Sequence, residues 1–320
     1  MSFKILSTID SYSEEARPIL ESLGNVIYKS DFTQEAFEAM APDYDILVVR
    51  LGLDIRRGLI ERATNLKAIA TATTGLDHID VKAAEEKGVA VVSLRGETEF
   101  LNTITGTAEL AFGLLLDLAR LTPWAFDAVK RYEWDLERFK GHNLAGMTLG
   151  VLGLGRLGRM TARFGKAFGM RVLFTDTEVS GDEQEEYRAY EKVDFDTLVS
   201  ESDALSIHVH LKDDTDNLFT KDVLAKMKSS AFLVNTSRGR IVNQEDLIAA
   251  LEAGTIAGYA TDVLEGETEF IKHFGNHPLV EYARTHQNCI IVPHTGGLTY
   301  ESRRDTDVFI AEKLKRFLEK

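Results

Sequence analysis

Residues 147–176, MTLGVLGLGRLGRMTARFGKAFGMRVLFTD, constrain the fold of this chain more than any other stretch. They place the pattern Gly153-Leu-Gly155-Arg-Leu-Gly158 between an apolar run and a helical pattern, and a second apolar run then ends at Asp176. A lone G-x-G-x-x-G is a weak signal, but the complete order of strand, loop, helix, strand and acid is much more specific. The stretch predicts a parallel βαβ unit whose glycine loop approaches a pyrophosphate group.

The three glycines of this loop have separate steric roles. Gly153 makes the tight turn, Gly155 lets the backbone approach a pyrophosphate, and Gly158 lets the helix pack against the strand. Free N–H groups and the positive end of the helix dipole favour phosphate at this helix N-terminus. Arg156 and Leu157 are therefore further candidate cofactor contacts.

Asp176 lies 18 residues after Gly158, where a carboxylate can accept hydrogen bonds from both adenosine ribose hydroxyls. It would repel the 2′-phosphate of NADP, and no arginine follows at Thr177 or Glu178. The segment therefore predicts NAD as the cofactor. A methyltransferase uses a related glycine loop and acidic strand end, so this segment alone leaves that alternative open.

Short apolar runs alternate with helical patterns along the whole chain, which is typical of parallel α/β sheets. A length of 320 residues favours two domains. We predict an α/β protein with two doubly wound parallel-sheet domains, the larger a Rossmann dinucleotide-binding domain of residues 102–295. The smaller, substrate-binding domain is expected from residues 1–101 together with residues 296–320.

The individual elements follow from the same patterns. The expected strands are residues 4–7, 44–49, 66–70, 89–92, 148–152, 171–175, 204–209, 232–235, 257–263 and 289–292. The expected helices are residues 13–23, 105–120, 122–132 and 303–320. Asn243 is predicted to cap a further helix, which Gly254 ends.

The composition disfavours several classes of partner. The chain has 51 acidic and 37 basic residues, and its net charge of −14 disfavours binding to nucleic acid or to anionic membranes. Its one cysteine, Cys289, allows no intrachain disulfide and is expected to be buried, because it opens an apolar run. The N-terminus shows no signal-peptide pattern, so a cytoplasmic protein is expected.

Three predicted strands of the larger domain are each followed by a polar residue suited to catalysis, namely Arg238, Glu267 and His294. The carboxyl ends of parallel strands lie along one edge of a doubly wound sheet, where ligands bind. Arginine can hold a carboxylate bidentately and polarise an adjacent carbonyl. Histidine can exchange a proton near neutral pH, and a carboxylate on its far nitrogen fixes the tautomer. Each signal is modest alone, but together they favour catalysis beside a dinucleotide.

The sequence resembles the NAD-dependent D-isomer-specific 2-hydroxyacid dehydrogenases over nearly its whole length. The resemblance rests on TTGLDHID (73–80), NTITGTAEL (102–110), GLGRLG with Asp176, NTSRGRIVNQEDL (235–247), GYATDVLEGE (258–267) and PHTGG (293–297). It implies hydride transfer between NAD(H) and C2 of a small 2-hydroxy or 2-keto acid. It also implies a homodimer formed through the NAD-binding domain, with the active site between the two domains. The alternative is a non-catalytic NAD-sensing module, because some relatives act as transcriptional co-regulators.

The resemblance assigns roles to individual residues. Arg238 would bind the substrate carboxylate and carbonyl, His294 would be the acid/base, and Glu267 would pair with His294. Asp262 would lie near the nicotinamide carboxamide. The remaining implied contacts are His208, Thr236 and Gly296 for the cofactor, and the backbone at Thr74 and Gly75 for the substrate.

The sequence departs from the family pattern in three places. Thr268 stands where the family commonly has proline after the catalytic glutamate. The usual H-x-P motif is replaced by His208-Val-His210. The chain stops at Lys320, so the C-terminal regulatory domain of some phosphoglycerate dehydrogenases is not expected.

Four histidines raise the question of a metal site. His208 and His210 share one face of a predicted strand, but no third ligand is evident, so no metal is expected. His273 and His277 are four residues apart, but a nearby glycine and proline favour a loop with solvated side chains.

The identity of the acid is not set by these motifs. Two arginines of the smaller domain, Arg50 and Arg95, could bind a second anionic group of the substrate. They are equally well explained as ordinary surface arginines.

Overall fold

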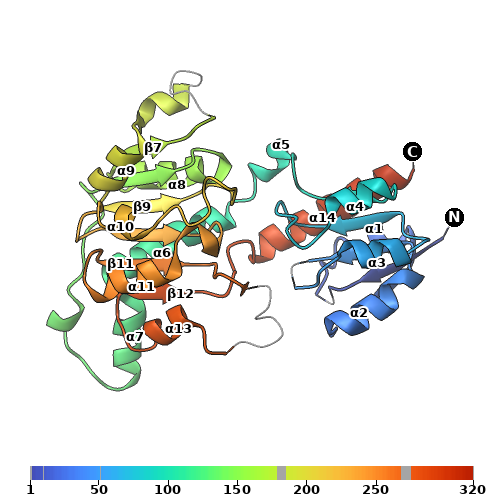
Figure 1. The fold of residues 1–320 in the computed structure, drawn as a ribbon, viewed down its shortest axis with the longest axis horizontal. Coiled ribbons are helices and arrows are strands. Elements are labelled where there is room, and N and C mark those ends of the chain that lie inside the picture. The colour runs from blue at the N-terminus through green and yellow to red at the C-terminus, as the bar shows by residue number, and fades with distance from the viewer. Residues whose placement is uncertain (1, 10, 51, 179–184, 268–274, 320) are drawn as a thin grey trace. The chain divides into compact units, whose positions relative to one another are not determined.

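The computed structural model describes residues 2–9, 11–50, 52–178, 185–267 and 275–319. The chain divides into two compact units (Figure 1). Of the described residues, unit 1 contains those from 2 to 104 and from 298 to 319, and unit 2 contains residues 105–267 and 275–297. Each unit is an α/β structure around a parallel sheet, so the predicted fold class is confirmed.

Unit 1 is built on a five-stranded sheet in the order β2-β1-β3-β4-β5, in which every pair is parallel. Its strands are β1 (Phe3–Ser7), β2 (Gly24–Tyr28), β3 (Ile46–Val49), β4 (Ala68–Thr71) and β5 (Ala90–Val92). Its helices are α1 (Arg17–Glu21), α2 (Gln34–Met40), α3 (Arg57–Arg62), α4 (Val81–Glu86), α5 (Thr98–Leu101) and α14 (Tyr300–Leu318). Helix α14 is far away in sequence but packs on this sheet, because Ile310, Ala311 and Leu314 complete one of its two apolar cores.

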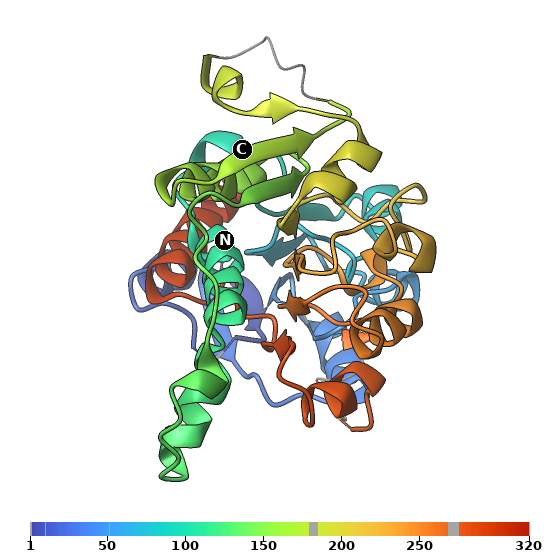
Figure 2. The same ribbon diagram turned by 90° about the vertical axis from the view of Figure 1, so that its left-hand side faces the viewer.

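Unit 2 is built on a seven-stranded parallel sheet in the order β12-β11-β10-β9-β6-β7-β8. Its strands are β6 (Thr148–Leu152), β7 (Arg171–Thr175), β8 (Glu191–Lys192), β9 (Ala204–Ile207), β10 (Phe232–Asn235), β11 (Gly258–Thr261) and β12 (Cys289–Ile291). Its helices are α6 (Gly106–Arg120), α7 (Thr122–Lys130), α8 (Arg156–Ala167), α9 (Phe195–Glu201), α10 (Lys221–Leu224), α11 (Gln244–Glu252) and α13 (Pro278–Ala283). Helices α6 and α8 cover one face of the sheet, and α9, α10 and α11 cover the other (Figure 2).

Strand order decides where a ligand can bind in unit 2. Strand β6 is the first strand of this sheet in sequence order, and it lies between β7 and β9. The chain therefore extends the sheet from β6 first in one direction and then in the other. Such a switch point opens a crevice at the carboxyl ends of the strands. The central strands β6, β9, β10 and β11 are buried at every position, as expected for a sheet covered on both faces, so they hold the loops that follow them rigidly.

The structure differs from the sequence prediction mainly at the sheet edges and at helix starts. The prediction missed β2, whose residues are alternately half-buried and exposed, and β8, which has only two residues. Helix α1 begins at Arg17, four residues later than expected, with Pro18 in its first turn. Helix α14 begins three residues earlier than expected, because Thr299 caps it by accepting from the Ser302 N–H at 2.9 Å. Among the described residues, no helix combines the length and apolarity needed to cross a bilayer.

Candidate active site

The Arg238 loop is shaped by the last residue of β10. Asn235 is fully buried; its side-chain amide donates to the Arg238 carbonyl at 2.9 Å, and its Oδ1 accepts from the Ser237 N–H at 3.0 Å. The Ser237 hydroxyl donates to the carbonyl of Ile207, at the end of neighbouring β9, at 2.9 Å. These bonds hold the half-buried Arg238 at the carboxyl edge of the sheet.

Glu267 and His294 are paired, as the resemblance implies. His294 Nδ1 lies 2.9 Å from Glu267 Oε1, while Glu267 Oε2 accepts from the Leu264 N–H at 3.1 Å. Because an ionised carboxylate only accepts, the proton of the neutral ring lies on Nδ1 and leaves Nε2 with a lone pair. The hydrogen bond to Glu267 raises the pKa of His294, although burial opposes the rise. The charge of Arg238 also opposes it, so Arg238 lies within electrostatic range of the imidazole.

Asp262 fixes the turn that carries His294. It is 2% exposed, and its two carboxylate oxygens accept from the Thr295 N–H at 2.6 Å and the Gly296 N–H at 2.8 Å. Burial raises the pKa of Asp262, and these two backbone N–H groups oppose that rise. A Cβ on Gly296 would lie 2.8 Å from Asp262 Oδ2, so this close approach requires glycine.

The glycine loop has the stereochemistry that the sequence predicts. Gly153 has a φ of 88°, in the left-handed region. A Cβ on Gly158 would lie 2.0 Å from the Gly153 carbonyl oxygen, whereas a Cβ on Gly155 would meet no described atom within 4 Å. Asp176 accepts from the Leu154 N–H at 2.7 Å, so the acid at the end of β7 is joined directly to the loop.

Buried polar atoms at the carboxyl edge of this sheet fit a dinucleotide. Thr236 Oγ1 and His208 Nδ1 are buried and have no hydrogen-bond partner among the described residues. His208 Nε2 contacts Ser206 Oγ at 2.9 Å, and burial lowers the pKa of His208 to about 4, so the ring is neutral at pH 7. Unsatisfied buried polar atoms are costly, so a polar ligand at this edge would stabilise the site. Within the described residues, no group of three or more side chains could hold a metal ion.

The substrate-side candidates lie in unit 1, after β3, β4 and β5. Thr74 is exposed and Gly75 is half-buried, and the Thr73 hydroxyl donates to the Gly75 carbonyl at 2.8 Å. Arg50, directly after β3, forms an ion pair with the buried Asp307 of α14. Arg95 is exposed on the loop after β5.

The prediction for one histidine is wrong. His277 was expected to be solvated, but it is 7% exposed and its ring hydrogen-bonds the backbone of Glu265, two residues before Glu267. His273 and Thr268 lie outside the described residues. The prediction for Cys289 is confirmed, because it is buried, and burial raises the pKa of its thiol to about 12.

Sequence reasoning missed the residues that support the site. Asn235 shapes the Arg238 loop, His277 contacts the Glu267 loop, and Asp307 neutralises Arg50. Of these three residues, only Asn235 could have been identified from the sequence. A polar residue that ends a run of buried strand residues needs internal hydrogen-bond partners.

Known proteins share this architecture and these sequence patterns. The chain is 37% identical over 315 residues to D-3-phosphoglycerate dehydrogenase of Methanocaldococcus jannaschii, a match covering 98% of this chain and 57% of that protein. It is 33% identical to hydroxypyruvate reductase of Thermotoga maritima, with 95% of each chain covered. The chain thus spans about half the length of the phosphoglycerate dehydrogenases that it matches.

Solved structures agree with this relationship. The TT0316 protein of Thermus thermophilus has a TM-score of 0.85 and 29% identity, with 99% of this chain and 97% of that chain covered. D-lactate dehydrogenase of Escherichia coli has a TM-score of 0.85 and 26% identity, with 99% and 96% covered. Residues 112–296 match the model of the D-isomer specific 2-hydroxyacid dehydrogenase NAD-binding domain. The chain belongs to the D-isomer specific 2-hydroxyacid dehydrogenase family.

Proposed function

We propose that this protein is an NAD-dependent oxidoreductase acting on C2 of a small 2-hydroxy or 2-keto acid, with the family's D-isomer specificity. The observation that carries the proposal is the 2.9 Å contact between His294 Nδ1 and Glu267 Oε1, in the same unit as Arg238 and the glycine loop. A bound nicotinamide would supply or accept the hydride. Relatives named phosphoglycerate dehydrogenase, hydroxypyruvate reductase and glyoxylate reductase support this substrate class.

The protein side chains would bind the acid and move its proton. The guanidinium of Arg238 would hold the substrate carboxylate and polarise the C2 carbonyl. In oxidation, His294 Nε2 would accept the hydroxyl proton, and in reduction the protonated ring would return a proton to the same oxygen. Glu267 would keep Nδ1 protonated and stabilise the imidazolium while the ring carries both protons. The backbone at Thr74 and Gly75 is the proposed contact for the substrate carboxylate from unit 1.

The proposed cofactor is NAD rather than NADP. Asp176 places a carboxylate at the end of β7, where the adenosine ribose of a dinucleotide bound to the glycine loop would lie. A 2′-phosphate would meet like charge at this position. The proposed cofactor contacts in the same unit are Gly153, Gly155, Arg156, Leu157, Gly158, His208, Thr236, Asp262 and Gly296.

The test is a panel of 2-keto acids with NADH, followed by the loss of reduced-cofactor absorbance, for the natural protein and for His294→Ala. We expect turnover by the natural protein and a loss of about 10²–10⁴-fold in the variant, because His294 moves the proton. NADH binding, measured by fluorescence titration, should be unchanged. Near-normal turnover by the variant would refute the role of His294. NADH binding without turnover of any acid would favour an NAD-sensing module instead.

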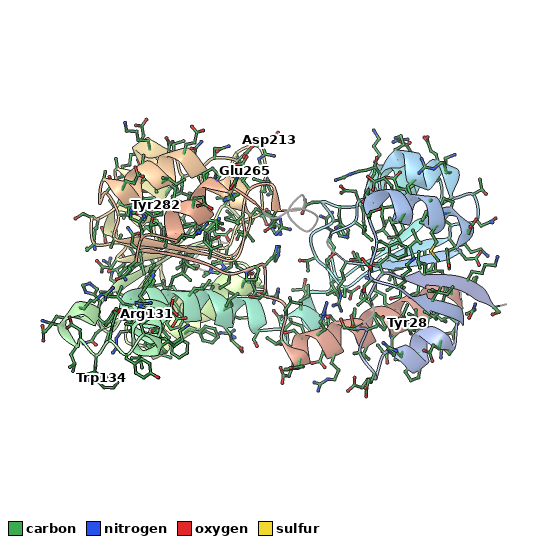
Figure 3. All side chains as sticks on the ribbon, turned by 90° about the horizontal axis from the view of Figure 1, so that it is seen from below. Tyr28, Arg131, Trp134, Asp213, Glu265 and Tyr282 are labelled. Carbon is green, nitrogen blue, oxygen red and sulfur yellow. The ribbon has the colours of Figure 1, made fainter. Side chains whose placement is uncertain are left out.

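We also propose that two copies associate through unit 2. The segment around α7 exposes large apolar side chains on the isolated chain, and Trp134 is 81% exposed (Figure 3). The other exposed apolar residues of this segment are Phe126, Val129, Tyr132 and Leu136. Several large apolar side chains exposed on one segment are typical of an interface. Light scattering should give the mass of a dimer, and a monomeric mass at micromolar concentration would contradict this proposal.

A further inference from the structure

The end of β3 in unit 1 carries a charge pair that joins distant parts of the chain. Arg50 directly follows β3, and its Nη2 donates to Oδ1 of Asp307, which lies in α14. The Asp307 side chain is completely buried and that of Arg50 is 17% exposed. Removing either partner would leave a largely buried charge uncompensated, so the pair resists separation.

The contacts of Asp307 act against the effect of burial on its charge. Its second carboxylate oxygen, Oδ2, accepts from the Ser13 N–H at 3.1 Å, so both oxygens serve as acceptors. Burial raises the pKa of Asp307, while the guanidinium of Arg50 and the Ser13 N–H oppose that rise. The Tyr12 hydroxyl donates to the Asp307 main-chain carbonyl at 3.2 Å and fixes the helix at this point. The pair is therefore held in place before any ligand binds.

Arg50 lies where a cation could contact substrate. Val49 of β3 pairs with Thr71 of β4, so Arg50 lies beside the start of the loop that contains Thr74 and Gly75. The carboxyl edge of a parallel sheet is its ligand-binding edge. A free arginine here would attract a second anionic group on the acid, whereas an arginine already paired with a buried carboxylate offers little net charge.

We propose that Asp307 is a specificity-determining residue, which neutralises Arg50 and so selects 2-keto acids with one negative charge over those with an added phosphate or carboxylate. The inference rests on the proposed function and narrows its substrate class. Arg95, on the loop after the edge strand β5, is exposed, so solvent screens its charge.

The test compares hydroxypyruvate with 3-phosphohydroxypyruvate, which differ only by the phosphate. We expect the natural protein to have the higher kcat/KM for hydroxypyruvate. Asp307→Asn keeps the volume but frees the charge of Arg50, and should raise the phosphorylated-to-unphosphorylated ratio by about tenfold or more. The matched control is Asp305→Asn, a half-buried residue of the same helix that pairs with Arg304, and it should leave the ratio unchanged. Adding Arg50→Gln to Asp307→Asn should restore the low ratio.

Three outcomes separate the two proposals. If the natural protein prefers the phosphorylated acid, the role of Asp307 is wrong even if the variants do not fold. If a folded Asp307→Asn protein keeps the natural ratio, the role is also wrong. If the natural protein reduces no 2-keto acid at all, the proposed function fails before specificity arises.

Discussion

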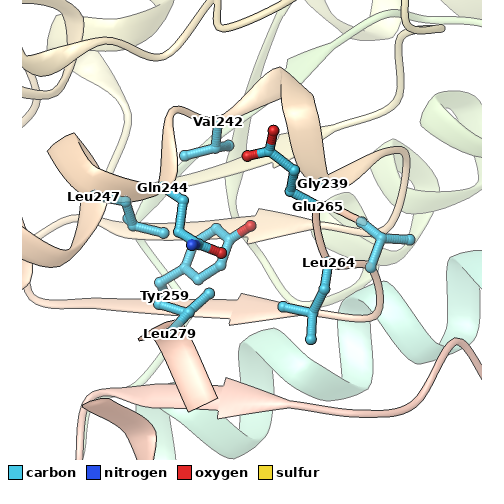
Figure 4. Close-up of a pocket in the computed structure, with 9 residues that line it drawn as sticks. Gly239, Val242, Gln244, Leu247, Tyr259, Leu264, Glu265 and Leu279 are labelled. Atoms are coloured by element: carbon cyan, nitrogen blue, oxygen red, sulfur yellow. The ribbon is translucent and has the colours of Figure 1, made fainter. Parts of the chain in front are cut away.

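Gly239 couples the two loops that carry the proposed catalytic residues, so Gly239→Ala should disrupt the site. Gly239 directly follows Arg238 and lies beside Leu264 and Glu265, just before Glu267 (Figure 4). An added Cβ would lie 2.3 Å from both the Glu265 nitrogen and the Leu264 carbonyl carbon. These are backbone atoms, so no side-chain rotation can relieve the overlap.

The size of the effect follows from these distances. Ordinary contacts of a Cβ begin at 3.4 Å, so the two loops must separate by about 1 Å. The adjacent cavity of about 10 Å³, lined by Gly239, Tyr259 and Glu265, has too little free volume to absorb a methyl group. Because a displacement of about 1 Å in a reacting geometry can cost on the order of 100-fold in rate, we expect kcat/KM to fall by about that factor. Overpacking should also cost about 1–3 kcal/mol of unfolding free energy.

The assay is NADH-dependent keto-acid reduction, with NADH affinity and thermal stability measured in parallel. The control is Gly58→Ala in α3, where the new Cβ would meet only Arg62 Nη1, at an ordinary 3.7 Å. The control should keep full activity, and NADH affinity should be unchanged in both variants. A folded Gly239→Ala protein with natural kcat/KM would show that the contact between the loops does not position the site.

Three further predictions concern charge. Glu267→Gln removes the group that raises the pKa of His294. Because keto-acid reduction requires the protonated ring, the rate should begin to fall at a lower pH in the variant than in the natural protein. An unchanged pH profile would contradict the pairing. Asp176→Ala should reduce the NADH-to-NADPH ratio of kcat/KM by about tenfold or more, and an unchanged ratio would show that another residue selects the cofactor. Burial lowers the pKa of His78, so the unfolded chain takes up the proton first, and stability should fall as pH drops below about 6.5. The unfolding free energy can be measured at pH 5 and pH 7 by urea titrations followed by circular dichroism. It should differ less between the two pH values in His78→Leu than in the natural protein. An equal difference in both proteins would refute the assignment.

Much of the unit 2 fold could be predicted because its signals are local. The strands β6, β7 and β10 have the predicted bounds, since each is a continuous apolar run between clear turn residues. The glycine loop was equally predictable, because the tight turn at Gly153 and the close packing at Gly158 are properties of glycine itself. Strand β2 was missed because an edge strand that is only partly buried lacks an apolar run.

The contacts that support the site could not be predicted in the same way. Arg50 and Asp307 are 257 residues apart, and Asp262 meets the Gly296 N–H across 34 residues. No periodicity in the sequence records such pairs, because they depend on how two elements approach each other after folding. His277 was misjudged for the same reason, since the burial of a loop residue depends on the loop that packs over it.

His294 has a strained backbone conformation that its neighbours hold in place. Its φ of 51° lies in the left-handed region, which costs a non-glycine residue on the order of 1–3 kcal/mol unless its surroundings impose it. Here Asp262 holds the two N–H groups that follow His294, and Glu267 holds its ring, so three hydrogen bonds fix the backbone and the side chain together. A proton-transfer group must be held in this way, because a ring free to rotate would not keep Nε2 directed at a substrate oxygen. The role of Asp262 therefore includes orienting His294, whether or not it also contacts a nicotinamide.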